Sequence, residues 1–158
     1  MKTIQLKNSE VVPVYNALEN IIVEGKARRG KGRFQKTLTT KNKEFADDLT
    51  DIRSGFFKKK DDGDFVEIDG KLVWLDKYKN DPEAKKKAND QTKELNEEII
   101  GIDLVEHETK IKSFFTSLDT DNFTVKEGLR DEDFETLMEI LENAFEDKKE
   151  EPKKEEEK

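Results

Sequence analysis

A glycine- and cation-rich stretch, GKARRGKGR at residues 25–33, is the first segment whose residue types and spacing could do chemistry. Gly25, Gly30 and Lys31 match the GxxxxGK spacing of a loop that wraps nucleotide phosphates. That loop also needs a Ser or Thr hydroxyl for magnesium, and it follows a strand of a parallel sheet. Gly32 stands where the hydroxyl belongs, and residues 21–23 continue a helical stripe. We therefore do not expect nucleotide hydrolysis.

The same stretch is a candidate contact surface, because cations can bind phosphates or acidic side chains without a loop of defined shape. The cations in question are Lys26, Arg28, Arg29, Lys31, Arg33 and Lys36. They lie within about one turn of the start of a predicted long helix, where each opposes the helix dipole by a few tenths of a kcal/mol. We expect this basic loop to meet an anionic partner, either an acidic protein surface or a nucleic acid.

Two observations favour the protein partner over the nucleic acid. Phe34 is the only aromatic residue near the cations, so the loop lacks the stacking platform of single-strand-binding proteins. The formal net charge of −8 would also repel a polyanion at long range. Nucleic-acid binding through residues 26–36 is kept as the alternative.

Carboxylates at Glu44, Asp47, Asp48 and Asp51 are spaced so that some share one helix face, as ligands of magnesium can. Hydrolytic metal sites draw ligands from several elements, and no second cluster is visible in the sequence. A solvated acidic face, partly paired with neighbouring lysines, explains the spacing better. We expect no metal and no cofactor.

Two further motifs are weaker. Residues 119–122 (DTDN) resemble the opening of a calcium loop, but Phe123, Thr124 and Arg130 stand at later ligand and turn positions. His107 has no Ser or Cys partner set in view, and the absence of Cys excludes a thiol nucleophile and thiolate metal sites. We expect no enzymatic activity and no catalytic residue.

Composition predicts one folded domain with a thin core. Charged residues make up 43% of the 158 residues and hydrophobic residues 32%. A single domain is expected over residues 1–146, followed by a disordered charged tail at 147–158 that contains no apolar residue. No apolar run approaches the roughly 18 residues of a membrane span. Because the start also lacks a signal peptide's hydrophobic segment, we expect a soluble cytoplasmic protein.

Hydrophobic periodicity predicts an α+β, mainly helical domain. One long helix is expected over about residues 33–58, with a narrow apolar seam that something must cover. A β-hairpin is expected around Asp69 and Gly70, and one or two short strands elsewhere. The other expected segments are a strand at 3–6, a helix from 9–12 to about 23, a loop or flexible helix entrance at 25–33, a helix from 81–82, a strand at 99–105 that could pair with the first, a helical face at 111–118 and a helix from about 131.

Charge is unevenly distributed along the chain. Residues 1–60 contain 14 Lys and Arg against 7 Asp and Glu, whereas residues 61–158 contain 16 against 31. Self-association is a further alternative, since the basic end of one copy and the acidic end of another can meet.

The order of several segments resembles bacteriophage proteins of domain-of-unknown-function family 1617. The resemblance rests on KNSE at residues 7–10 before a Pro-containing helix, GKARRGKGRF at 25–34, KNKEFADDLTDIR at 41–53, GKLVW at 70–74 and EIIGIDL at 98–104. It covers about residues 2–146 and carries no functional residue, because the family has no assigned activity. It implies a phage-encoded protein that acts in the host cytoplasm, with the virion as the less favoured location. No catalytic constellation is found in the sequence, whereas the narrow seam, the thin core and the uneven charge favour a partner, so the expected function is a non-enzymatic accessory role through binding a phage or host protein.

Overall fold

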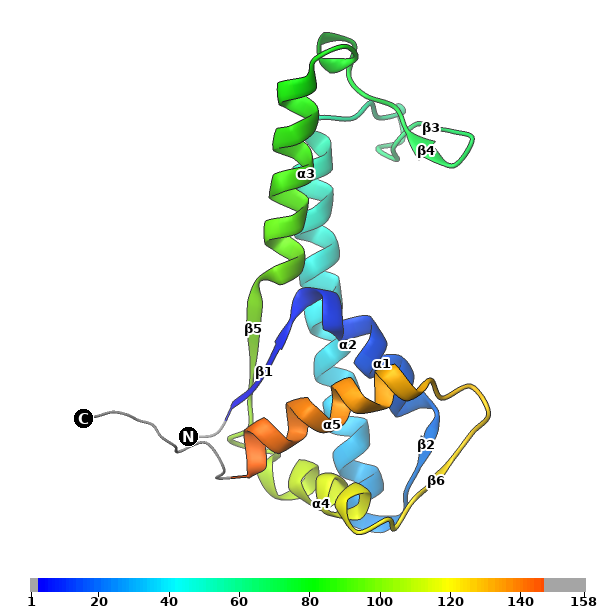
Figure 1. Cartoon of the computed structure of the whole chain (residues 1–158), viewed down its shortest axis with the longest axis vertical. Coiled ribbons are helices and arrows are strands. Elements are labelled where there is room, and N and C mark those ends of the chain that lie inside the picture. The colour runs from blue at the N-terminus through cyan, green and yellow to red at the C-terminus, as the bar shows by residue number, and fades with distance from the viewer. Residues whose placement is uncertain (1–2, 147–158) are drawn as a thin grey trace, which may run out of the picture. The chain divides into compact units, whose positions relative to one another are not determined.

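The computed structural model describes residues 3–146, and within them it is an α+β fold dominated by helices (Figure 1). The strands are β1 (Thr3–Lys7), β2 (Ile21–Ile22), β3 (Glu67–Ile68), β4 (Lys71–Leu72), β5 (Ile99–Asp103) and β6 (Thr124–Val125). The helices are α1 (Val11–Glu19), α2 (Gly25–Ser54), α3 (Pro82–Glu97), α4 (Glu108–Asp119) and α5 (Asp131–Phe145), with short 3-10 turns at Asn8–Glu10 and Asp76–Tyr78. The predicted fold class, with its one long helix, is confirmed.

The described chain divides into two compact units. Unit 1 comprises the residues up to Asn42 and those from Ile99 onward, and unit 2 comprises Lys43–Glu98. The single domain over residues 1–146 therefore stays a prediction. The charged tail at 147–158 lies outside the described residues.

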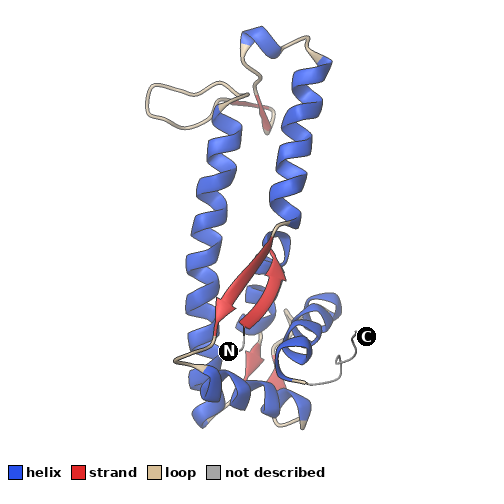
Figure 2. Cartoon of the chain, turned by 90° about the vertical axis from the view of Figure 1, so that its left-hand side faces the viewer, coloured by secondary structure: helices blue, strands red, loops and turns tan. Residues whose placement is uncertain are grey.

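In unit 1, β1 and β5 form an antiparallel pair in which Ile4 lies opposite Ile102 and Leu6 opposite Ile100 (Figure 2). Burial alternates along β1, with Ile4 and Leu6 inside and their neighbours exposed, as period-two geometry requires. Helix α5 packs against β1 and α1. This sheet places the apolar faces of α1, α4, α5 and the first part of α2 in one core, centred on side chains such as Phe34 and Phe114.

The first helix is shorter than expected, and this corrects the prediction that it runs to about residue 23. Helix α1 ends at Glu19, and Ile21 pairs with Val125 in a two-stranded antiparallel ribbon of β2 and β6. The Asn20 carbonyl accepts a hydrogen bond from the Lys126 amide at 2.8 Å, which ties this turn to the start of the ribbon. Because Ile21 is fully buried as a strand residue, the apolar spacing that suggested a helix is satisfied by a strand.

The long helix begins eight residues earlier than the predicted residue 33, so of the two readings of residues 25–33 the loop is wrong and the entrance to the helix is the one that the structure has. Gly25 has φ 61°, a left-handed conformation that turns the chain into the helix. From there Ala27, Gly30, Phe34 and Leu38 form a buried stripe at helical spacing. Burial of this stripe outweighs the low helix propensity of three glycines. The helix ends at Ser54, short of the predicted residue 58.

Unit 2 contains residues 43–54 of α2, helix α3 and the segment between them. Asp69 and Gly70 both have positive φ (54° and 78°) and form the tight turn of the β3–β4 hairpin, as expected. Asp81 caps α3, since its Oδ1 accepts hydrogen bonds from the amides of Glu83 and Ala84 at 3.0 and 3.2 Å. Four aromatic side chains pack between the hairpin and the end of α2: Phe56, Phe57, Trp74 and Tyr78.

Candidate functional site

The six cations singled out in the sequence lie on the first three turns of α2. The GKARRGK run is helical, so its backbone amides beyond the first turn donate hydrogen bonds to carbonyls of the helix. They therefore cannot wrap a phosphate. The preceding strand β2 belongs to an antiparallel ribbon rather than a parallel sheet. The arrangement therefore lacks the geometry of a nucleotide-phosphate loop.

Close packing against α4 explains why glycine occupies position 30, the second glycine of the GxxxxGK spacing. An ideal Cβ on Gly30 would lie 1.9 Å from the carbonyl oxygen of Lys110 and 3.0 Å from the amide nitrogen of Ile111. The first turns of α2 thus approach the backbone of α4 so closely that only glycine fits there. This contact also fixes which side of α2 faces the core and which side faces solvent.

Four of the six cations share one side of α2. At about 100° per residue, Lys26, Arg29, Arg33 and Lys36 fall within an arc of about 80° that is turned away from the buried stripe. All four are exposed. From the first to the last, the helix rises about 15 Å. We call these four residues the basic face.

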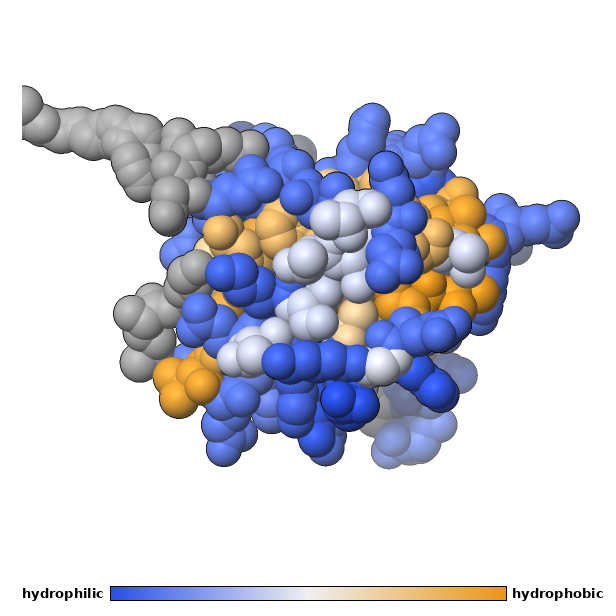
Figure 3. Space-filling view, turned by 90° about the horizontal axis from the view of Figure 1, so that it is seen from below, coloured by the Kyte–Doolittle hydropathy of each residue, from blue (hydrophilic) through white to orange (hydrophobic). Residues whose placement is uncertain are grey.

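The charged groups of the basic face form no ion pair or side-chain hydrogen bond with any residue from 3 to 146. The first turn of α2 also contains no acidic residue to offset them. The space-filling view of Figure 3 shows a surface on which hydrophilic side chains lie between separate apolar patches. The basic face therefore presents uncompensated positive charge to a partner.

Lys31 and Arg28 lie on other sides of the helix, so the structure splits the predicted set. The Lys31 ammonium is partly buried and donates a hydrogen bond to the Ile21 carbonyl at 2.8 Å, which ties β2 to α2. Burial is the main cause of the lowered pKa of Lys31; Glu19 raises it, and Lys126 and Arg28 lower it. Lys31 has a structural partner inside unit 1 and is not free for an external one.

Replacing Lys31 with methionine should change how stability depends on pH. Because the pKa of Lys31 is lowered from 10.5 in the folded protein, the unfolded chain binds more protons between the lowered value and 10.5. The wild-type free energy of unfolding should therefore rise relative to that of Lys31→Met as pH increases through this window. Urea denaturation at neutral pH and near pH 10.5 measures the difference. Equal pH dependence of the two proteins would contradict the expectation.

The other candidate residues from the sequence lie apart. Glu44, Asp47, Asp48 and Asp51 are exposed on the unit 2 part of α2, and the described chain contains no group of three or more metal-binding side chains. Residues 119–122 end α4 and form a turn in which the Ser117 carbonyl accepts from the Asn122 amide at 2.8 Å.

His107 precedes α4, and its Nε2 lies 3.7 Å from a carboxylate oxygen of the exposed Glu106. Its Nδ1 is buried without a hydrogen-bond partner among the described residues. Within residues 3–146 no hydroxyl group hydrogen-bonds to the His107 ring, so the described part of the chain holds no nucleophile–base pair there.

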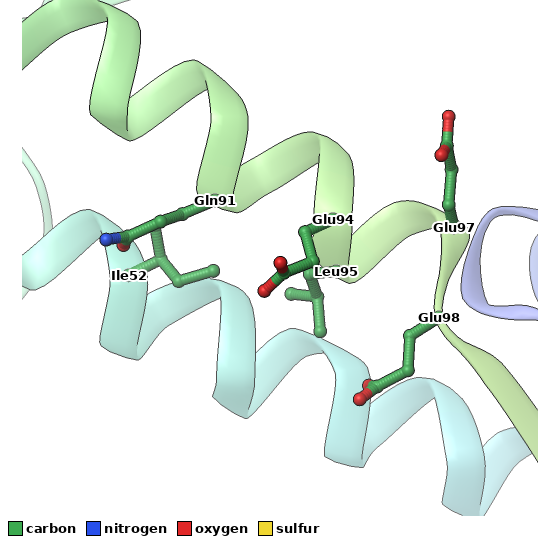
Figure 4. Close-up of a pocket in the computed structure, with 6 residues that line it drawn as sticks. All are labelled: Ile52, Gln91, Glu94, Leu95, Glu97 and Glu98. Carbon is green, nitrogen blue, oxygen red and sulfur yellow. The ribbon is translucent and has the colours of Figure 1, made fainter.

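A second surface feature was missed by sequence reasoning. A groove of about 640 Å³ runs along unit 2, lined by Ile52 of α2 and by residues of α3 and the turn that follows it (Figure 4). Glu94, Leu95 and Glu98 point toward α2, whereas the carboxylate of Glu97, which also lines the groove, points away from α2. The small residues of α3 were the available signal, because a helix with few large apolar side chains cannot fill the space beside a partner helix.

Comparisons of the chain with protein-family models, with curated proteins and with solved structures find no match. The resemblance to phage family 1617 therefore stays a prediction. In the part of the chain that the structure describes, no helix is long and apolar enough to span a membrane.

Proposed function

We propose that the protein is a phage-encoded accessory protein that acts in the host cytoplasm by binding another protein, without catalysis. The observation that supports this is the basic face: Lys26, Arg29, Arg33 and Lys36 are exposed, aligned and unpaired among residues 3–146. Helix geometry alone would favour acidic residues in the first turn of α2, so Lys26, which lies in that turn, costs stability there. An acidic partner surface would offset that cost.

The magnitudes fit an interaction whose rate and specificity depend on charge. An exposed ion pair contributes about 0.2–1 kcal/mol, so four of them cannot supply a tight complex on their own. They would steer the partner and fix its register, while apolar contacts beside them supply the remaining affinity. Association should therefore weaken when salt is raised.

Affinity purification from host cells that carry the phage tests the proposal. A variant with Lys26, Arg29, Arg33 and Lys36 all changed to Gln should recover at least about tenfold less of the partner than the wild type, because the charge contacts are lost. Quantitative mass spectrometry measures the recovery. Recovery of an untagged copy of the chain would identify self-association as the contact.

The matched control changes four exposed lysines of unit 2 to Gln: Lys60, Lys71, Lys79 and Lys93. This control removes the same charge, so it should retain the partner. Equal loss in both variants would contradict the proposal, because total charge and not the basic face would then decide binding.

Nucleic-acid binding through residues 26–36 is the second candidate, favoured by the same alignment of four cations along about 15 Å of helix. It predicts a shift of labelled duplex DNA or RNA at low salt, with a log–log salt slope near −0.9 per neutralised phosphate on duplex DNA. Our proposal predicts no shift. A shift that disappears in the four-Gln variant would replace the protein partner with a nucleic acid.

A further inference from the structure

The two helical segments of unit 2 have seam positions whose side chains differ in size. On each segment residues of lower exposure are spaced by four, three and four, the pattern of a helical seam. They are Phe45, Leu49, Ile52 and Phe56 on the α2 side, and Ala84, Ala88, Gln91 and Leu95 on α3. The α2 side therefore has four large apolar side chains, whereas α3 has two alanines, one amide and one leucine.

This mismatch leaves apolar surface uncovered. Phe45, Leu49 and Ile52 are only partly buried, whereas seam residues in a filled core are excluded from water. The groove of about 640 Å³ and a second hollow of about 490 Å³ share Ile52 and Gln91, so they continue one another along the same side of the helix pair. The combined groove follows most of α3, which rises about 24 Å.

The rim of this groove is acidic. The acidic residues that line it are Asp51, Asp81, whose Oδ1 also caps α3, Glu83, Glu94, Glu97 and Glu98, against one cation, Lys87. Between these acids lie the apolar side chains Ile52 and Leu95, which Figure 4 shows on facing sides, together with the amide of Gln91. An apolar floor between negative rims is complementary to a helix that has an apolar stripe flanked by positive charges.

We infer that this groove of unit 2 binds an amphipathic basic helix of a partner protein. Leucine-like side chains at spacings of four and three lie on the Ile52 and Leu95 floor, and flanking Lys or Arg residues meet the rim carboxylates. About 14 residues of helix cover the length of the groove. The groove shares no residue with the basic face, so the two surfaces can be tested separately.

Fluorescence anisotropy with a defined probe tests the inference on the full chain. The probe is a labelled peptide of about 14 residues that contains only Leu and Lys, with Leu at spacings of four and three. It should bind saturably. A scrambled peptide of equal composition and a Leu–Glu peptide of the same pattern should each bind at least about tenfold more weakly. Equal binding of the scrambled peptide, or tighter binding of the Leu–Glu peptide, would overturn the inference.

Variants locate the bound peptide. Asp51→Lys with Glu94→Lys should weaken binding by about tenfold or more, because both carboxylates lie on the rim. Ile52→Ala, at a partly exposed position, should weaken it by a similar factor through loss of the floor. The matched control is Glu127→Lys with Glu135→Lys, two exposed acids of unit 1, and it should bind as the wild type does. Equal weakening in the control would overturn the inference.

Discussion

Gly30→Ala should lower the free energy of unfolding by about 2–4 kcal/mol, because the added methyl group has no space. Its Cβ would lie 1.9 Å from the carbonyl oxygen of Lys110 and 2.5 Å from the carbonyl carbon. Both are backbone atoms, so no side-chain rotation relieves the contact. Helix α2 and the start of α4 must separate, which loosens the surrounding core of unit 1. Urea denaturation followed by circular dichroism measures the loss.

Gly32→Ala provides the matched control two residues away. Gly32 is exposed in the same helix, and an ideal Cβ there meets nothing within 4 Å. Alanine should therefore raise the free energy of unfolding by up to about 1 kcal/mol, since it has the higher helix propensity. Equal effects of the two substitutions, or a Gly30→Ala protein as stable as the wild type, would contradict the packing described for α2.

The double variant Lys26→Glu with Arg29→Glu should change binding and stability in opposite directions. Partner affinity should fall by roughly 100-fold, because two attractive contacts become repulsive. Folding should gain up to about 1 kcal/mol, because acids near the start of α2 complement the helix dipole. A glutamate at position 29 would also lie four residues before Arg33, which adds a favourable pair of a few tenths of a kcal/mol.

Measuring both quantities separates a functional surface from a structural one. Affinity for the recovered partner is measured by calorimetry, and stability by urea denaturation. If the cations of the basic face stabilised the fold, the double variant would have a lower free energy of unfolding than the wild type. If they contributed to neither folding nor binding, its affinity for the partner would stay within about twofold of the wild type.

Much of the fold follows from local signals in the sequence. The alternation of Ile4 and Leu6 predicts the strand that pairs with residues 99–103, and the Asp69–Gly70 pair predicts the hairpin. Asp81 before Pro82 predicts the start of α3. In each case neighbouring residues determine the backbone conformation, so a window of a few residues is enough to predict the element.

The misplaced boundaries depend on contacts that such a window does not contain. Residues 25–33 are helical because Ala27, Gly30 and Phe34 are buried, and their glycines alone suggest a loop. Ile21 and Ile22 are extended because β6, about one hundred residues later in the chain, pairs with them. The apolar spacing of this segment fits a helix and a strand equally well.

The candidate site was predicted in part. The sequence identified six cations, and the face that each occupies became clear only once the helix was known to begin at Gly25. In the sequence Lys31 is one cation among six, whereas in the structure its ammonium donates a hydrogen bond to the Ile21 carbonyl. The groove could not be found from spacing alone, because it results from the pairing of α2 with the small residues of α3.

Titration of the purified partner against three forms of the chain tests the central claim most directly. The forms are the wild type, the four-Gln variant of the basic face and the four-Gln control of unit 2, each at about 50 and about 200 mM salt. Our account predicts that the variant binds at least about tenfold more weakly than the wild type at low salt, that the difference shrinks at higher salt, and that the control binds like the wild type. Wild-type affinity in the basic-face variant at both salt concentrations would contradict it.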